Sequence, residues 1–155
     1  MKLGLAVLLI LAAVSVASAD TNMTCKATSE ADIKGLFDRW NNSLKTGNPD
    51  EVVKNYASDA ILLPTVSNKP RLTQDERRDY FVHFLENKPV GEINMRVIKL
   101  GCNDAIDAGI YTFSFGDGPN KGKQVRARYT YTYTLNDGKW LISSHHSSAM
   151  PEKSD

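Results

Sequence analysis

Two adjacent histidines, His145 and His146, lie near the end of the chain in the segment KWLISSHHSSAMPE, which has the composition of a strand. Histidine titrates near neutral pH, so its side chain can donate, accept or transfer a proton. Successive residues of a strand point to opposite faces of a sheet. Only one of the two can therefore face a pocket, and the pairing with the neighbouring strand decides which one.

The preceding strand, QVRARYTYTYTL (124–135), alternates two kinds of side chain with a period of two. Its odd positions carry tyrosines, Tyr131 among them, and its even positions carry Arg126, Arg128 and threonines. An arginine offers two coplanar donors that match a carboxylate, so Arg126 and Arg128 are candidate ligands for an acid. Strand propensity alone also produces a tyrosine and threonine alternation, and that simpler interpretation stays open.

An Asn-Asp-Gly turn joins these two strands, and two pairings are considered. In the first, Arg128 faces His146 across the strands and makes a cationic site suited to a carboxylate. In the second, shifted by one residue, Arg128 pairs with Ser147, and His146 joins Tyr129 and Tyr131. That arrangement suits proton transfer on a neutral aromatic ligand. We favour the first pairing.

A catalytic alternative requires a carboxylate near a histidine or a phenol. Asp107 is the acid that falls inside a predicted strand, and it lies an even number of positions from Tyr111, so both would point to the same face. Asp104 and Asp59 fall in turns. His146 with Asp107 or Tyr111 is therefore the candidate catalytic set of a small isomerase, dehydratase or cyclase. The sequence contains no glycine-rich phosphate loop, nucleophile elbow or metal-ligand spacing, so neither a cofactor nor a metal is expected.

The elements that must position these residues begin with three predicted helices. They start after the capping residues Ser29, Asn48 and Thr73, each followed by acids in the first turn, and their apolar residues recur at helical spacing. A short strand is expected at 60–65, and from Val90 onward the period changes to two. Helices followed by hairpin-joined strands predict an α+β fold in which three helices cover one face of an antiparallel sheet, and a strongly curved sheet closed by helices in this way makes a cone with a pocket.

Residues 1–19 have the pattern of a secretory signal peptide, with one early lysine, an apolar run and a final Ala-Ser-Ala. We expect an N-terminal arm over 20–28, one domain over 29–152 and a tail over 153–155. A secreted or periplasmic location follows. The apolar run is shorter than the ~20 residues that span a bilayer, so no membrane association is expected after cleavage.

The two cysteines, Cys25 and Cys102, would enter an oxidising compartment after export. They are candidates for one disulfide, and two separate thiols are equally compatible with the sequence, which contains no zinc-type spacing. The whole chain carries 19 basic and 18 acidic residues, and the signal peptide accounts for one lysine and no acid. A mature chain with balanced charge has no long-range field that would attract nucleic acid.

The order of the elements and three motifs carry a resemblance to a known family. DGKWLISSHHSSAMPE, together with ARYTYTY and DAGIYTF (107–113), resembles the association (hub) domain of calcium/calmodulin-dependent protein kinase II. It is more similar still to the free-standing bacterial relatives of that domain, often called SgcJ/EcaC-like, within the nuclear transport factor 2-like (SnoaL-like) superfamily. The resemblance covers about residues 29–152.

The resemblance implies a cone-shaped fold, dimers or larger closed oligomers formed through the sheet, and a polar pocket in which arginines bind small carboxylate-bearing molecules. Metazoan hubs carry His-Arg-Ser near their end, whereas this chain reads His146-Ser147-Ser148. Acid recognition would therefore fall to other arginines, either in the strands or at Arg77 and Arg78 of the third helix.

We accordingly expect an exported, self-associating domain that binds a small polar or carboxylate-bearing molecule in its cone. The expected ligand-binding residues are Arg128, His146, Tyr111, Tyr131, Arg126 and Arg77. The small isomerase, dehydratase or cyclase is the alternative from another class, and a pure assembly module with an empty pocket is the third.

Overall fold

The computed structural model describes residues 24–65 and 67–151, and the predicted signal peptide and tail lie outside them. Its helices are α1 (Glu30–Leu44), α2 (Pro49–Val53) and α3 (Gln74–Leu85), with a 3-10 turn at Gly118–Asn120. Its strands are β1 (Tyr56–Leu63), β2 (Pro89–Leu100), β3 (Asp104–Phe115), β4 (Gln124–Asn136) and β5 (Lys139–Ala149). The predicted α+β fold is confirmed.

The helices begin where the capping signals place them. The Ser29 side chain accepts the N–H of Asp32 while the Asp32 carboxylate accepts the N–H of Ser29, and Thr73 and Glu76 form the same reciprocal pair at α3. Asn48 caps α2, in which Pro49 is the first residue. Each cap satisfies backbone donors that a first helical turn leaves unpaired, which is why these positions could be predicted.

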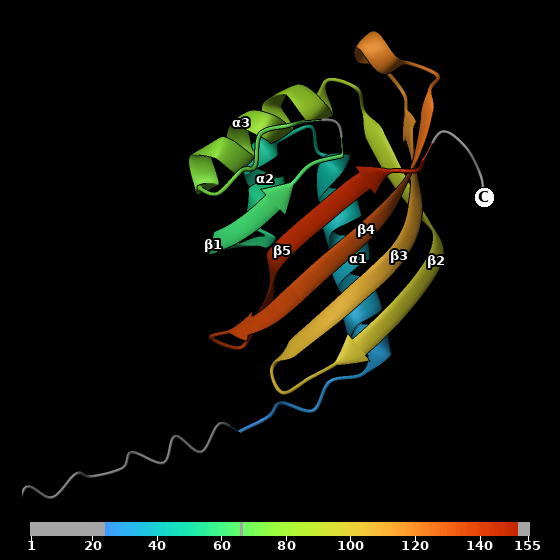
Figure 1. Ribbon diagram of the computed structural model, residues 1–155. Coiled ribbons are helices and arrows are strands. Elements are labelled where there is room, and N and C mark those ends of the chain that lie inside the picture. The colour runs from blue at the N-terminus through green and yellow to red at the C-terminus, as the bar shows by residue number, and fades with distance from the viewer. Residues whose placement is uncertain (1–23, 66, 152–155) are drawn as a thin grey trace, which may run out of the picture.

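The sheet has the strand order β1-β5-β4-β3-β2. The three pairs among β2, β3, β4 and β5 are antiparallel as predicted, but β1 pairs parallel to β5, so the sheet is mixed. In Figure 1, α1 crosses one face of the sheet, α2 and α3 lie beside β1, and the face toward the viewer is covered by no helix of the described segments. No helix of those segments is long and apolar enough to cross a membrane.

Aromatic side chains fill the space between α1 and the sheet. Trp40 is 1% exposed, and its ring centroid lies 5.8 Å from that of Tyr131 and 6.1 Å from that of Phe113. Phe37, one turn earlier on the same stripe, packs on Tyr129 and Tyr131. The odd positions of β4 thus face α1, so the tyrosine row forms part of the core.

Neither predicted pairing of β4 with β5 holds at the histidines, because a β-bulge interrupts the hairpin. Tyr133 lies opposite Ile142, but Thr132 lies opposite Ser144, so Ser143 is an extra residue on β5. The Ser143 hydroxyl donates to the Thr132 carbonyl at 3.1 Å. A bulge exchanges the faces of all later residues. His145 therefore pairs with Tyr131 and faces the helices, while His146 faces away from them.

A disulfide between Cys25 and Cys102 ties the segment before α1 to the turn between β2 and β3. Asn103 strengthens the same attachment, because its side-chain amide donates to the Thr24 carbonyl and its amide oxygen accepts the N–H of Lys26. The bond joins residues 77 apart in sequence. Restricting the unfolded chain over such a loop stabilises the fold by about 4 kcal/mol.

Arg77 holds α3 against β1 and is fully buried. The pairing of β1 with β5 is irregular between Tyr56 and Ile61, and the Arg77 guanidinium donates to carbonyls in and beside that stretch. Those carbonyls belong to Ala57, Ser58, Ala60 and Leu72. The predicted role of Arg77 in ligand binding is therefore replaced by a structural one, since its donors satisfy buried backbone acceptors.

Replacing Arg77 by methionine is expected to lower the free energy of unfolding by about 3 kcal/mol, because buried carbonyls lose a charged donor. Arg78→Met is the matched control, since Arg78 lies on the surface and pairs with exposed Asp50. Its loss should stay within about 0.5 kcal/mol. Urea denaturation of both variants measures the difference, and equal stability losses would contradict the role given to Arg77.

Candidate functional site

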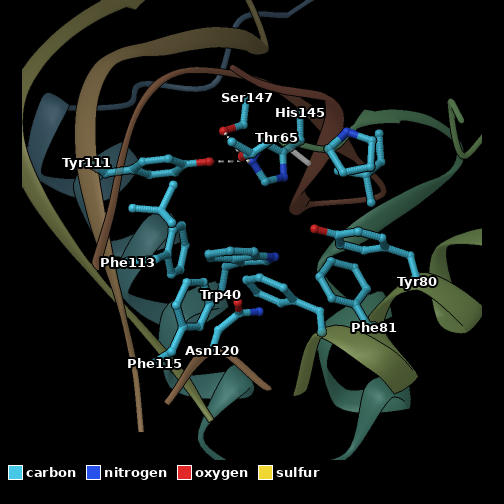
Figure 2. A pocket seen from close by; sticks show the side chains of 14 residues that line it. Trp40, Thr65, Tyr80, Phe81, Tyr111, Phe113, Phe115, Asn120, His145 and Ser147 are labelled. Carbon is cyan, nitrogen blue, oxygen red and sulfur yellow. Dashed lines mark hydrogen bonds between the residues drawn. The ribbon is translucent and has the colours of Figure 1, made fainter. Parts of the chain in front are cut away.

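A cavity of about 190 Å³ lies between α3, the concave side of the sheet and the loop after β1. Figure 2 shows its side chains converging from these separate elements. Half of the residues in the wall are phenylalanine, tyrosine or tryptophan, and these are Trp40, Tyr80, Phe81, Phe84, Tyr111, Phe113 and Phe115. A mostly apolar hollow with a few converging polar groups is the usual form of a small-molecule site.

Four polar side chains gather at one end of the cavity, which we call the polar corner and define as Thr65, Tyr111, His145 and Ser147. The Tyr111 hydroxyl points at His145, with 3.5 Å between its oxygen and Nε2 (Figure 2). The hydroxyls of Thr65 and Ser147 are hydrogen-bonded to each other. Three hydroxyls and one imidazole nitrogen therefore meet at this end, while Tyr80 and Asn120 add polar side chains elsewhere in a mostly apolar lining.

A chain of hydrogen bonds behind the cavity determines which nitrogen of His145 carries the proton. Trp40 donates its indole N–H to the Tyr56 oxygen at 3.0 Å, and the same oxygen lies 3.0 Å from His145 Nδ1. The phenol proton of Tyr56 needs an acceptor, and within the described residues Nδ1 is the one that geometry provides. Nδ1 is therefore the bare nitrogen, and Nε2–H faces the polar corner.

Burial keeps the polar corner uncharged. It lowers the pKa of His145 to about 3, with a smaller contribution from the charge of His146. It also raises the pKa of Tyr111 to about 12, an effect that hydrogen bonds from Ser147 and Thr65 partly oppose. Both side chains are neutral at pH 7, since desolvation disfavours the charged form of either group.

The structure separates the predicted ligand residues instead of bringing them together. Tyr111 lines the cavity, and Tyr131 lies behind it with its ring stacked on His145 at 4.1 Å between centroids. Arg126, Arg128 and His146 are exposed on the opposite face of the sheet. The predicted arginine-lined pocket is therefore not formed, because the even positions of β4 point away from the helices.

Sequence reasoning missed His145 and Ser147 as cavity residues. Ser147 is the position at which this chain departs from the His-Arg-Ser of metazoan hubs, and its hydroxyl lies in the polar corner. That departure was the available signal, because it marked the place where a cation is replaced by a neutral hydroxyl. The choice between the two histidines depended on the bulge and had no comparable signal.

Asp107 belongs to a second buried cluster outside the cavity. Its Oδ1 accepts hydrogen bonds from the Tyr129 hydroxyl at 2.8 Å and from Arg96 Nε at 3.1 Å. Burial raises the pKa of Asp107, while Tyr129 and Arg96 oppose that shift. The predicted catalytic set of His146 with Asp107 is not assembled, since the two side chains lie on opposite faces of the sheet.

The cavity can bind and polarise a hydrogen-bond acceptor, but its described lining contains no general base for proton abstraction. No Asp, Glu, Lys or Arg is found in that lining, and the bare nitrogen of His145 is occupied by Tyr56. No group of three or more His, Cys, Asp or Glu side chains in residues 24–65 and 67–151 could hold a metal ion. Recognition is thus better supported by this geometry than acid-base chemistry.

Comparison with known proteins gives a family match over most of the chain. Residues 29–151 match the family model of the calcium/calmodulin dependent protein kinase II association domain. A solved protein from Xanthomonas campestris, named for the same domain, is 48% identical, with a TM-score of 0.76 and coverage of 86% of this chain and 99% of that chain. No functionally curated protein matches the chain.

More distant solved structures share the fold alone. A nuclear transport factor 2-like protein from Pseudomonas putida KT2440 is 17% identical, with a TM-score of 0.66 and coverage of 78% of this chain and 86% of that chain. A Streptomyces avermitilis protein, named as a dehydratase of the nuclear transport factor 2-like family, is 11% identical, with a TM-score of 0.68. That match covers 77% of this chain and 94% of that chain.

The low pKa of His145 predicts a pH-dependent stability. The folded protein resists protonation of His145 down to about pH 3, whereas an unfolded histidine binds a proton below about pH 6.5. Stability from this group is fully present above that pH and is lost as the pH falls. We expect the free energy of unfolding to drop by ~2 kcal/mol between pH 7 and pH 5, measured by urea denaturation.

Two variants assign this effect to one side chain. His145→Gln should remove the ~2 kcal/mol dependence over this range, because the amide does not titrate. His146→Gln changes the exposed neighbour and should leave the dependence in place. An undiminished pH dependence in His145→Gln would show that other groups cause it.

Proposed function

Because the chain belongs to the calcium/calmodulin dependent protein kinase II association domain family, we propose that it is an exported, self-associating domain that binds a small molecule in its cone. Membership of an association domain family favours self-association. The observation that carries the proposal is the outer face of the sheet, which we define as the side turned away from α1.

Apolar side chains are exposed on the outer face along β2, β3 and β1, whereas β4 and β5, which lie between them, carry polar side chains there. Met95 and Val97 on β2 are each 49% exposed, and Ile106 on β3 is 42% exposed. Ile61 and Leu63 extend the same face onto β1. Exposed apolar patches on a sheet face are typical of an interface, and two copies related by a twofold axis would present the same patches to each other.

The cavity supports the binding part of the proposal, with a change in the expected ligand chemistry. Its polar corner is neutral, and the predicted Arg128 and Arg126 lie on the outer face. A pocket enclosed by aromatic rings and containing uncharged donors suits a small, mostly apolar molecule better than a carboxylate. The enzyme alternative gains no support from the described lining, which lacks a carboxylate.

Two features favour export. Residues 1–19 have the composition of a cleavable signal peptide, and Cys25 and Cys102 are joined in a disulfide. Disulfides persist mainly in oxidising compartments such as the periplasm and the extracellular space. A secreted or periplasmic location is accordingly part of the proposal.

Native mass spectrometry of the protein purified from its own host, without reducing agent, tests the proposed function. We expect a dimer or larger closed oligomer of chains that begin at Asp20 and contain one disulfide. We also expect a small-molecule adduct that disappears on denaturation, because the binding is non-covalent. A monomer that retains residues 1–19 and carries no adduct would contradict the proposal.

A pair of variants tests the outer face itself. Ile106→Asp should raise the dimer dissociation constant at least ~100-fold, since each copy would bury an unpaired charge. Val82→Asp is the control, because Val82 is similarly exposed at 39% but lies on α3, on the opposite side of the sheet. Sedimentation equilibrium measures both variants, and an unaltered constant for Ile106→Asp would exclude this face as the interface.

A further inference from the structure

We propose that the cavity binds a neutral molecule built on one aromatic ring with a hydrogen-bond acceptor such as a ketone, and that it excludes the corresponding carboxylate. The inference rests on the proposed binding function and specifies the ligand class of that same site. It departs from the carboxylate chemistry that the sequence suggested.

The size of the cavity sets the size of the ligand. A dry apolar cavity of about 150 Å³ accommodates benzene. The cavity here measures about 190 Å³, so it has room for one ring with a small substituent. A multi-ring ligand would require the walls to move, and these walls are aromatic rings packed on one another.

The wall geometry favours a flat ring. Phe84 and Phe113 meet edge to face with 5.7 Å between ring centroids and 79° between planes, and Trp40 meets Phe113 at 6.1 Å and the same angle. Phe84 also meets Phe115 at 90°. Rings set at right angles offer both faces and edges to the space between them, the two kinds of contact that an aromatic ligand makes best.

The polar corner specifies an acceptor on that ring. His145 presents a fixed N–H, because Tyr56 occupies its other nitrogen. The 3.5 Å from Nε2 to the Tyr111 oxygen is at the limit of a hydrogen bond, so this N–H is weakly used and remains available to a ligand acceptor. A carbonyl oxygen placed there would also reach hydroxyls of the corner, whose protons rotate freely.

The absence of a counter-charge excludes an anion. No Lys or Arg occurs in the described lining of the cavity. Arg71 lines a neighbouring hollow of about 250 Å³, where its guanidinium donates to the Asp79 carboxylate at 2.9 Å and lies over the Tyr80 ring. Transfer of a carboxylate into aromatic surroundings without a partner costs several kcal/mol, more than the corner's neutral donors return.

Three probes with the same ring test the inference. Acetophenone carries a carbonyl acceptor, ethylbenzene has nearly the same shape without one, and benzoate is an anion at pH 7. Calorimetric titration of the mature, disulfide-bonded protein should show acetophenone binding about 5- to 10-fold more tightly than ethylbenzene, the worth of one neutral hydrogen bond. Benzoate should bind at least ~10-fold more weakly than acetophenone. Benzoate as the tightest probe, or equal affinities for the two neutral probes, would overturn the inference.

Two phenylalanine variants test whether Tyr56 acts as the positioning residue. Tyr56→Phe removes the hydroxyl that occupies Nδ1, so the proton of His145 can move to that nitrogen, and the advantage of acetophenone over ethylbenzene should fall to about 1- to 2-fold. Tyr131→Phe is the matched control, because the Tyr131 ring stacks on the same imidazole but its buried hydroxyl has no hydrogen-bond partner in the described structure. It should keep the full advantage.

Loss of the advantage in Tyr131→Phe alone would overturn the role of Tyr56. The wild-type series of three probes decides the ligand class even if Tyr56→Phe does not fold.

The outcomes also separate this inference from the proposed function. If no probe binds but the host-purified protein carries a releasable adduct, the ligand class is wrong and the binding function stands. If no probe binds and no adduct is found, both fail.

Discussion

The hydrogen-bond chain from Trp40 through Tyr56 to His145 is the constraint on which the site depends. Its members come from α1, β1 and β5, so the chain forms only when the helix, the parallel edge strand and the last strand are all in place. The chain has a direction, because an indole N–H can only donate. The phenol therefore donates in turn to the imidazole, and the imidazole presents an N–H donor, not an acceptor, to the cavity.

The β-bulge at Ser143 decides which histidine enters this chain. Without the extra residue, the pairing of Tyr133 with Ile142 would continue in step and would place His146 opposite Tyr129, on the core side. With it, His145 enters the core and His146 joins the outer face. One residue in a hairpin thus assigns one histidine to the cavity and the other to the surface proposed for self-association.

Local chemistry explains how much of the fold could be predicted. Ser29, Asn48 and Thr73 cap their helices through hydrogen bonds made within three residues, so the sequence alone contains the relevant information. The parallel pairing of β1 and the bulge in β5 depend on contacts between distant segments, which local patterns do not encode. Arg77 was predicted to bind a ligand, and only the irregular pairing of β1 explains its burial against backbone carbonyls.

The resemblance identified the family. The position at which this chain departs from the family's pattern proved more informative about the site than the residues chosen by their odd or even position along a strand. Ser147, the residue at which this chain departs from the His-Arg-Ser of metazoan hubs, faces the cavity, whereas Arg128 and His146 face away from it. Strand parity correctly grouped Arg128 with His146 on one face. It could not say which face met the helices, because both faces of β4 carry side chains that favour strands.

The most direct measurement is the ring nitrogen-15 spectrum of His145 in the intact, mature protein, recorded with long-range proton correlation between pH 7 and pH 5. A hydrogen-bond chain directed from Trp40 to His145 requires one protonated nitrogen at Nε2 and one bare nitrogen at Nδ1, unchanged across that range because burial lowers the pKa of His145 to about 3. A proton on Nδ1, or conversion to imidazolium above pH 5, would contradict the neutral, donor-presenting site on which the ligand inference is built.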